Sequence, residues 1–119
     1  STEFDAMLDE YEYEENYEKG AHLNIRFRPI INKDTKKLEW NYVNKNGEYV
    51  SMGDEKNKSF SKVKEKLNEL YGDDLNEFKD DNIKVVDGKW NTVTTSSDGI
   101  ETYEKIDDEK FQANADVLY

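Results

Sequence analysis

The feature that most constrains the fold of this chain is a set of turn dipeptides, each lying between short stretches rich in β-branched and aromatic residues. These dipeptides are Asn46-Gly47, Asp87-Gly88 and Asp98-Gly99. Glycine, asparagine and aspartate tolerate the positive φ that tight turns require, so such pairs join neighbouring antiparallel strands. For Asn46-Gly47 we expect a type I′ turn, in which both central residues have positive φ. The chain should therefore contain β-hairpins.

The first strand is predicted over residues 22–31, where apolar and polar side chains alternate at first. Residues 38–43 and 49–52 continue this rhythm on either side of the Asn46-Gly47 turn, which gives a three-stranded meander. Pro29 has no N–H to donate, so we expect it at a sheet edge or a bulge. The side chains expected to share a face are Leu23, Ile25 and Phe27 on the first strand and Leu38, Trp40 and Tyr42 on the second.

The main helix is predicted over about residues 60–71, with Ser59 as its N-cap and Gly72 as its C-cap glycine. A capping-box pattern of Asp74 with Glu77 predicts one further helical turn, which would carry Leu75 and Phe78. The apolar stripe of the main helix consists of Phe60, Val63, Leu67, Leu70 and Tyr71.

A second meander follows the helix, with strands expected over residues 83–86, 89–95 and 100–106. Short helices are expected at both ends of the chain. The first spans about residues 3–12, with Thr2 as its cap, and the last begins after Asp107. The apolar positions of these helices are Phe4, Leu8 and Tyr11 in the first, and Phe111, Ala115 and Leu118 in the last.

These elements predict an α+β fold, with an antiparallel β-sheet of about five to six strands in two meanders, one main helix packed on it and short terminal helices. The 119 residues suit one domain, which we place at residues 20–119, after an acidic, tyrosine-rich N-terminal helix and arm at residues 1–19. Thirteen percent of the residues are aromatic, which argues against disorder despite a charged fraction of 38%.

Charge is distributed unevenly along the chain, whose net charge is −11. Residues 1–18 contain eight acidic residues and no basic one, while residues 19–68 contain twelve basic residues against six acidic ones. Residues 69–119 are acidic again, with fourteen acids against five bases. Three solvated surfaces would account for this pattern without any partner. The alternative is that the acidic parts attract a basic partner over a distance.

Several classes of site are disfavoured by the sequence. There is no cysteine, no glycine-rich phosphate loop and no calcium-binding loop pattern. The only histidine, His22, stands in no nucleophile motif, and the acids between Asp73 and Asp81 include the helix-capping pair. We therefore expect no catalytic residues, no metal and no cofactor. No stretch approaches the roughly 20 apolar residues that a membrane span needs.

The favoured hypothesis is a non-enzymatic acidic protein-binding module. More narrowly, it is an inhibitor or antagonist that imitates nucleic acid, as phage anti-defence or immunity proteins can, and occludes a basic groove on a nucleic-acid-handling protein. Spaced carboxylates would stand in for phosphates, and tyrosines would supply contact area. The partner-binding residues of this hypothesis are Asp9, Glu10, Tyr11, Glu12, Tyr13, Glu14, Glu15, Tyr17 and Glu18.

Two alternatives stay open. One is a single-stranded nucleic-acid-binding accessory protein with an acidic regulatory tail, because bases and aromatic residues share the first meander. Its binding residues would be Arg26, Arg28, Lys36, Lys37 and Lys45. The other is an extracellular or surface-anchored interaction domain. No signal peptide is recognisable, which slightly favours the cytoplasm, while secretion or surface anchoring stays an alternative.

Overall fold

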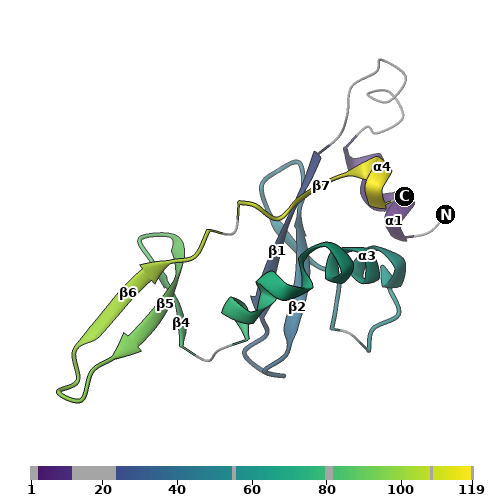
Figure 1. Ribbon diagram of the computed structural model, residues 1–119. Helices are drawn as coiled ribbons and strands as arrows, with labels where there is room; N and C mark the ends of the chain where they lie inside the picture. Colours follow the sequence, from purple (N-terminus) through teal and green to yellow (C-terminus); the bar gives the residue numbers. More distant parts are fainter. Residues whose placement is uncertain (1–2, 12–23, 55, 80–81, 108, 119) are drawn as a thin grey trace.

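The computed structural model describes residues 3–11, 24–54, 56–79, 82–107 and 109–118. It consists of a body, made of a four-stranded sheet and the helices, and a three-stranded sheet that projects from it (Figure 1). The elements are α1 (Glu3–Glu10), β1 (Asn24–Ile31), β2 (Leu38–Val43), β3 (Tyr49–Ser51), α3 (Ser61–Tyr71), the 3₁₀ helix η1 (Gly72–Phe78), β4 (Ile83–Val86), β5 (Lys89–Thr95), β6 (Glu101–Lys105), β7 (Gln112–Asn114) and α4 (Ala115–Leu118).

The four-stranded sheet has the strand order β3-β2-β1-β7, and its three pairings are antiparallel. The expected alternation is confirmed in β1, where Ile25 and Phe27 are buried, while Leu23 lies outside the described residues. In β2 the expected inward residues Trp40 and Tyr42 are buried, but Asn41 and Val43 are buried as well, so burial does not alternate there. Arg26 and Arg28 lie on the opposite face. Strand β7 pairs only with the first part of β1, at Asn24, Ile25 and Arg26. Pro29 lies beyond this part and pairs with β2 alone, so it is locally at a sheet edge, as expected.

The hairpin between β2 and β3 is confirmed, but the expected type I′ turn is wrong. Gly47 alone has positive φ, at 80°, and its N–H donates to the carbonyl of Asn44 at 3.0 Å. This geometry is a type I turn followed by a left-handed glycine. The Asn44 side-chain oxygen explains the outcome, because it accepts hydrogen bonds from the N–H groups of Asn46 and Glu48 at 3.0 and 2.9 Å.

Helix α3 packs against the buried face of this sheet, and Trp40 Nε1 donates to Asn68 Oδ1 at 3.0 Å. Two details of its expected ends are wrong. Its N-cap is Phe60, which has left-handed φ, and no side chain caps the helix, while the Ser59 hydroxyl bonds to Glu3 instead. Gly72 follows the last residue of α3, but its φ of −55° is right-handed, so the chain continues directly into η1.

Helix η1 confirms the expected further helical turn, because Leu75 and Phe78 are both buried. The C-terminal region differs from the expectation. Asp107 does not cap the last helix, since residues 112–114 form strand β7, which pairs with β1. Helix α4 begins only at Ala115. Phe111 precedes β7 and lies at the centre of the core, in edge-to-face contact with the rings of Trp40, Tyr71 and Phe78.

The second meander forms a separate sheet, of order β4-β5-β6, rather than extending the first one. Asp87 and Gly88 both have positive φ, 51° and 74°, so the turn between β4 and β5 is of type I′. This sheet lengthens the molecule, which measures 58 × 28 × 24 Å. The radius of gyration of 16.1 Å accordingly exceeds the value of about 13.5 Å expected for a compact chain of this length.

Candidate protein-binding surface

Helix α1 presents an acidic outer surface because its large apolar side chains turn inward. Met7 and Leu8 are 1% and 4% exposed and belong to the main core, and Phe4 packs partly against it. Asp9 and Glu10 are exposed in the last turn. That turn contains no basic residue, although the negative end of the helix dipole favours cations there. These two carboxylates therefore occupy positions that do not favour helix stability.

Tyr11 follows α1 and is held against the body. Its N–H donates to the carbonyl of Leu8 at 2.9 Å, and its ring packs on the core. Burial is the main cause that raises the pKa of Tyr11 to about 12, and the nearby Tyr42 and Glu10 add to this rise. The packed ring of Tyr11 therefore anchors the end of α1.

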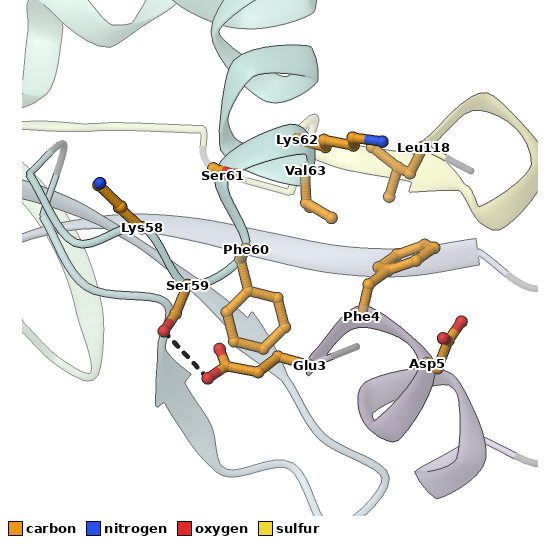
Figure 2. Close-up of a pocket in the computed structure, with 10 residues that line it drawn as sticks. All are labelled: Glu3, Phe4, Asp5, Lys58, Ser59, Phe60, Ser61, Lys62, Val63 and Leu118. Atoms are coloured by element: carbon orange, nitrogen blue, oxygen red, sulfur yellow. Dashed lines mark hydrogen bonds between the residues drawn. The ribbon is translucent and has the colours of Figure 1, made fainter. Parts of the chain in front are cut away.

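A groove of about 690 Å³ lies beside α1, where this helix meets the start of α3 (Figure 2). Figure 2 shows that its lining comes from three separate segments of the chain, around α1, the start of α3 and α4. Glu3 and Asp5 lie on the α1 side, and Lys58 and Lys62 on the α3 side. The apolar lining consists of Phe4, Phe60, Val63 and Leu118.

The loop that leads into α3 shapes one wall of this groove. The Lys64 side chain is buried, and its ammonium donates hydrogen bonds to the carbonyls of Asp54, at 2.8 Å, and Asn57. These bonds hold the loop against the helix. Gly53 has a φ of 80° and lies against the Asn57 side chain so closely that a Cβ atom would collide with it.

Phe60 combines an unusual backbone with a partly exposed ring. Its φ of 57° and ψ of 24° are left-handed, a conformation that is costly for a residue with a bulky side chain. Its ring lies 5.9 Å from that of Tyr42, centroid to centroid. Next to it, the Ser59 hydroxyl donates to Glu3 Oε1 at 3.0 Å, which links the α1 side of the groove to the α3 side (Figure 2).

The structure describes part of the predicted acidic site. Asp9, Glu10 and Tyr11 are placed on and next to α1. The acids between Asp73 and Glu77 do not extend this surface, because η1 follows the far end of α3, and α3 is about 16 Å long. The remaining predicted partner-binding residues lie outside the described residues, and these are Glu12, Tyr13, Glu14, Glu15, Tyr17 and Glu18.

The predicted basic site is divided. Arg26 and Arg28 share the outer face of β1, and the Arg28 guanidinium lies 4.8 Å from the ring centroid of Tyr49. Lys36 and Lys37 belong to the turn between β1 and β2, and Lys37 pairs with Asp54 at 3.9 Å. Lys45 lies in the turn between β2 and β3, at the other end of β2. The structure thus places the Arg28 guanidinium beside two aromatic rings, those of Tyr49 and, at 6.0 Å, Trp90, whereas the three lysines are divided between the two ends of β2.

Sequence patterns did not reveal the groove. Phe60 fits the apolar stripe of α3, Phe4 that of α1, and Leu118 that of the last helix, so each is accounted for as a core residue. Only their convergence in space makes a groove, and no spacing in the sequence encodes it. The left-handed backbone of Phe60 likewise has no sequence signal.

Within the described ranges, no group of three or more histidine, cysteine, aspartate or glutamate side chains could hold a metal ion. The same residues include no helix long and apolar enough to cross a membrane. Comparisons of the chain with protein-family models, curated proteins and solved structures find no match. Function must therefore be argued from the chemistry of the surface.

Proposed function

We propose that this chain is a non-enzymatic module that binds a basic protein through α1 and the adjoining groove. The observation that carries the proposal is the position of Asp9 and Glu10, exposed in the last turn of a helix that borders a groove lined by both apolar and charged side chains. Each acid at such a position costs roughly 0.3–1 kcal/mol relative to a favourable placement. A partner that supplies lysine or arginine side chains would offset this cost.

The groove adds apolar contacts, which charged side chains alone do not supply. Protein interfaces obtain most of their affinity from a few apolar or aromatic anchors in well-packed pockets, whereas rim charges mainly steer and orient the encounter. Phe4 and Phe60 offer aromatic walls for such an anchor, and Glu3 and Asp5 make the α1 side of the groove negative, while Lys58 and Lys62 line the opposite side. The favoured partner segment therefore carries an apolar side chain for the groove and basic side chains that lie over α1, away from these two lysines.

Nucleic-acid-handling proteins present basic surfaces of this kind, because their grooves are lined by lysine and arginine that neutralise phosphates. Carboxylates on α1 would occupy such a groove and exclude the nucleic acid. The proposed mechanism is thus competitive occlusion, by an inhibitor or antagonist that imitates the charge of a phosphate backbone.

A peptide probe tests the proposal on the described residues. The probe is a synthetic lysine- and arginine-rich peptide with one central tryptophan, titrated into isotope-labelled protein by NMR. Shifts should concentrate on α1, Phe60 and Val63. The double change Asp9→Asn with Glu10→Gln should weaken binding about twofold to thirtyfold, since each of the two exposed ion pairs contributes about 0.2–1 kcal/mol.

The matched control removes the same charge elsewhere, by Asp34→Asn with Glu109→Gln, and should leave the affinity unchanged. Both carboxylates of the control are exposed. Equal weakening in both double variants would show that the peptide responds to net charge alone, and the proposed surface would be wrong.

One observation favours the second candidate, single-stranded nucleic-acid binding. Tyr49, unlike the core aromatics, lies on the face of the arginines, with Arg28 against its ring, and a ring beside a cation is the arrangement that holds a stacked base and its phosphate. A labelled oligonucleotide should bind saturably at low salt, weaken steeply at moderate salt, and lose affinity in Arg26→Gln and Arg28→Gln. The absence of binding at low salt would rule this candidate out.

A further inference from the structure

Strand β6 is an open edge of the projecting sheet. It pairs with β5 on one side and has no strand on the other among the described residues, and all five of its residues are exposed. Figure 1 shows that this sheet extends away from the helices, so the body does not cover β6. An exposed edge presents unpaired N–H and C=O groups that can pair with another strand.

The hydrogen bonds of this sheet show which backbone groups of β6 point outward. The N–H of Ser96 donates to the carbonyl of Ile100, and the N–H of Ile106 donates to the carbonyl of Trp90, each at 2.9 Å. Even-numbered residues of β6 therefore direct their backbone groups toward β5. Because this direction alternates along an antiparallel strand, Glu101, Tyr103 and Lys105 direct theirs outward.

These same three residues share one face of the sheet, because side chains two apart on a strand point the same way. Tyr103 is 45% exposed at the middle. Glu101 lies toward one end, where Lys84 reaches it at 2.9 Å and the Tyr103 hydroxyl donates to it. Lys105 lies toward the other end. The edge thus carries an acid, an aromatic ring and a base in order.

We propose that β6 pairs antiparallel with β6 of a second copy of this chain, with Tyr103 opposite Tyr103 at the twofold axis. In this register Glu101 of each copy lies opposite Lys105 of the other. Every outward N–H and C=O of the three residues is then paired. An interface of this kind is isologous, so each favourable charge pair occurs twice.

Neighbouring registers are poorer. A shift of one residue in a single copy would direct outward groups of one strand against inward groups of the other, so the hydrogen bonds could not form. A shift of two residues keeps the outward backbone groups of both strands facing each other. It places Tyr103 opposite Glu101 or Lys105, however, and leaves the outward N–H and C=O groups at the ends of the two strands unpaired. A shift of four residues places Glu101 opposite Glu101, where two like charges repel. Backbone phase and charge therefore select the same alignment.

A second copy fits this edge better than a strongly basic or acidic partner does, because the edge carries both charges in a self-complementary order. The net charge of −11 opposes self-association, but the acidic helix α1 lies at the other end of a molecule 58 Å long, and residues 82–107 carry only a small excess of five acids over three bases (Figure 1). Salt screens exposed charges beyond about 8–10 Å, so this repulsion is weak at physiological ionic strength. An interface built on one strand is small, and we expect a Kd on the order of 100 µM.

Two charge reversals test the register. Lys105→Glu places acids opposite acids, and Glu101→Lys places bases opposite bases, so each variant alone should remain monomeric up to about 1 mM in sedimentation velocity. Mixed in equal amounts, the two variants should associate, because the two acidic side chains on the edge of the first then lie opposite the two basic side chains on the edge of the second. In wild type, the Tyr103 amide should become protected from hydrogen exchange as concentration rises.

The control is Lys89→Glu, which makes the same charge change on the central strand β5 and should associate like wild type. A wild type that stays monomeric at about 1 mM would overturn the proposal. So would a variant mixture that fails to associate, or a Lys89→Glu protein that loses association to the same extent as Lys105→Glu.

Discussion

The body and the projecting sheet differ in how they bury apolar side chains. Strands β1 and β2 each place alternate residues against α1, α3 and η1, so the core includes Phe27, Trp40 and Leu67, which are buried from several sides. Strands β4, β5 and β6 contribute no fully buried residue to that core. Ile83 and Trp90 pack against it only partly, and Val93 is buried separately.

This difference implies that the body and the projecting sheet of the same domain differ in local stability. Local openings cost less free energy where few apolar contacts are lost, so the projecting sheet should open without unfolding the body.

The largest effect is expected for Phe111→Ala in the body. The Phe111 ring is 0% exposed and touches three other aromatic rings, so its removal leaves a cavity that cannot collapse easily. The free energy of unfolding should fall by about 3–5 kcal/mol, as measured by urea denaturation. Tyr103→Ala in β6 should change it by no more than about 0.5 kcal/mol. Similar losses in the two variants would contradict the comparison.

Trp90→Ala addresses the junction between the two regions. The Trp90 ring is half-buried and lines a small cleft with Pro29, Phe78 and Ile83. We expect a loss of about 2 kcal/mol, roughly half that of a fully buried aromatic ring. Hydrogen exchange should show the loss in the amides of β5 and β6, while those of β1 and β2 stay protected. Uniform loss across both sheets would show that the regions open together.

Two glycines allow the same change in equivalent turns. Gly47 in the body and Gly99 in the projecting sheet have φ of 80° and 83°, and a Cβ atom would meet no neighbour at either position. Alanine should therefore cost about 1–2 kcal/mol of backbone strain at both sites. Gly47→Ala should lower global stability in denaturant, whereas Gly99→Ala should mainly lower the exchange protection of β5 and β6. An equal loss of global stability in both variants would contradict the proposed difference between the body and the projecting sheet.

Much of the fold was predictable because its elements are specified locally. Alternating apolar and polar residues predicted most of the strands, and the Asn-Gly and Asp-Gly pairs predicted the turns. The apolar stripe that includes Val63 and Leu67 predicted α3. The division into two sheets was not predictable in this way. It depends on β7, a strand of only Gln112–Asn114 that pairs with residues far away in the chain, and no local pattern announces it.

Side-chain chemistry at the element ends was also only partly predictable. Ser59 is a good N-cap residue, yet the structure uses its hydroxyl for Glu3, a residue more than fifty positions earlier. Asn44 accepts two backbone hydrogen bonds that change the turn type at Asn46-Gly47. Similarly, the acidic character of α1 is visible in the sequence, while the groove next to it depends on three segments meeting in space.

The smallest effects concern two tyrosines, one in each region. Burial is the main cause that raises the pKa of Tyr11 in the body to about 12, from 10.0 in an unfolded chain. The stability that Tyr11 contributes is therefore complete below pH 10.0 and is lost as pH rises toward 12. Tyr11→Phe keeps the ring without the ionisable hydroxyl, so this variant should withstand a higher pH than wild type in alkaline unfolding followed by circular dichroism.

In the projecting sheet, the pKa of Tyr103 is also raised, but mainly because its hydroxyl donates to Glu101. Removing that charge by Glu101→Gln should return the Tyr103 pKa toward its ordinary value, as followed by NMR of the labelled ring. The matched change Glu10→Gln beside Tyr11 should leave the Tyr11 pKa raised, because burial rather than the neighbouring carboxylate is its main cause. A Tyr11 pKa that returned to normal in Glu10→Gln would mean that charge, not burial, governs both tyrosines, and the contrast between a buried body and an exposed sheet would lose this support.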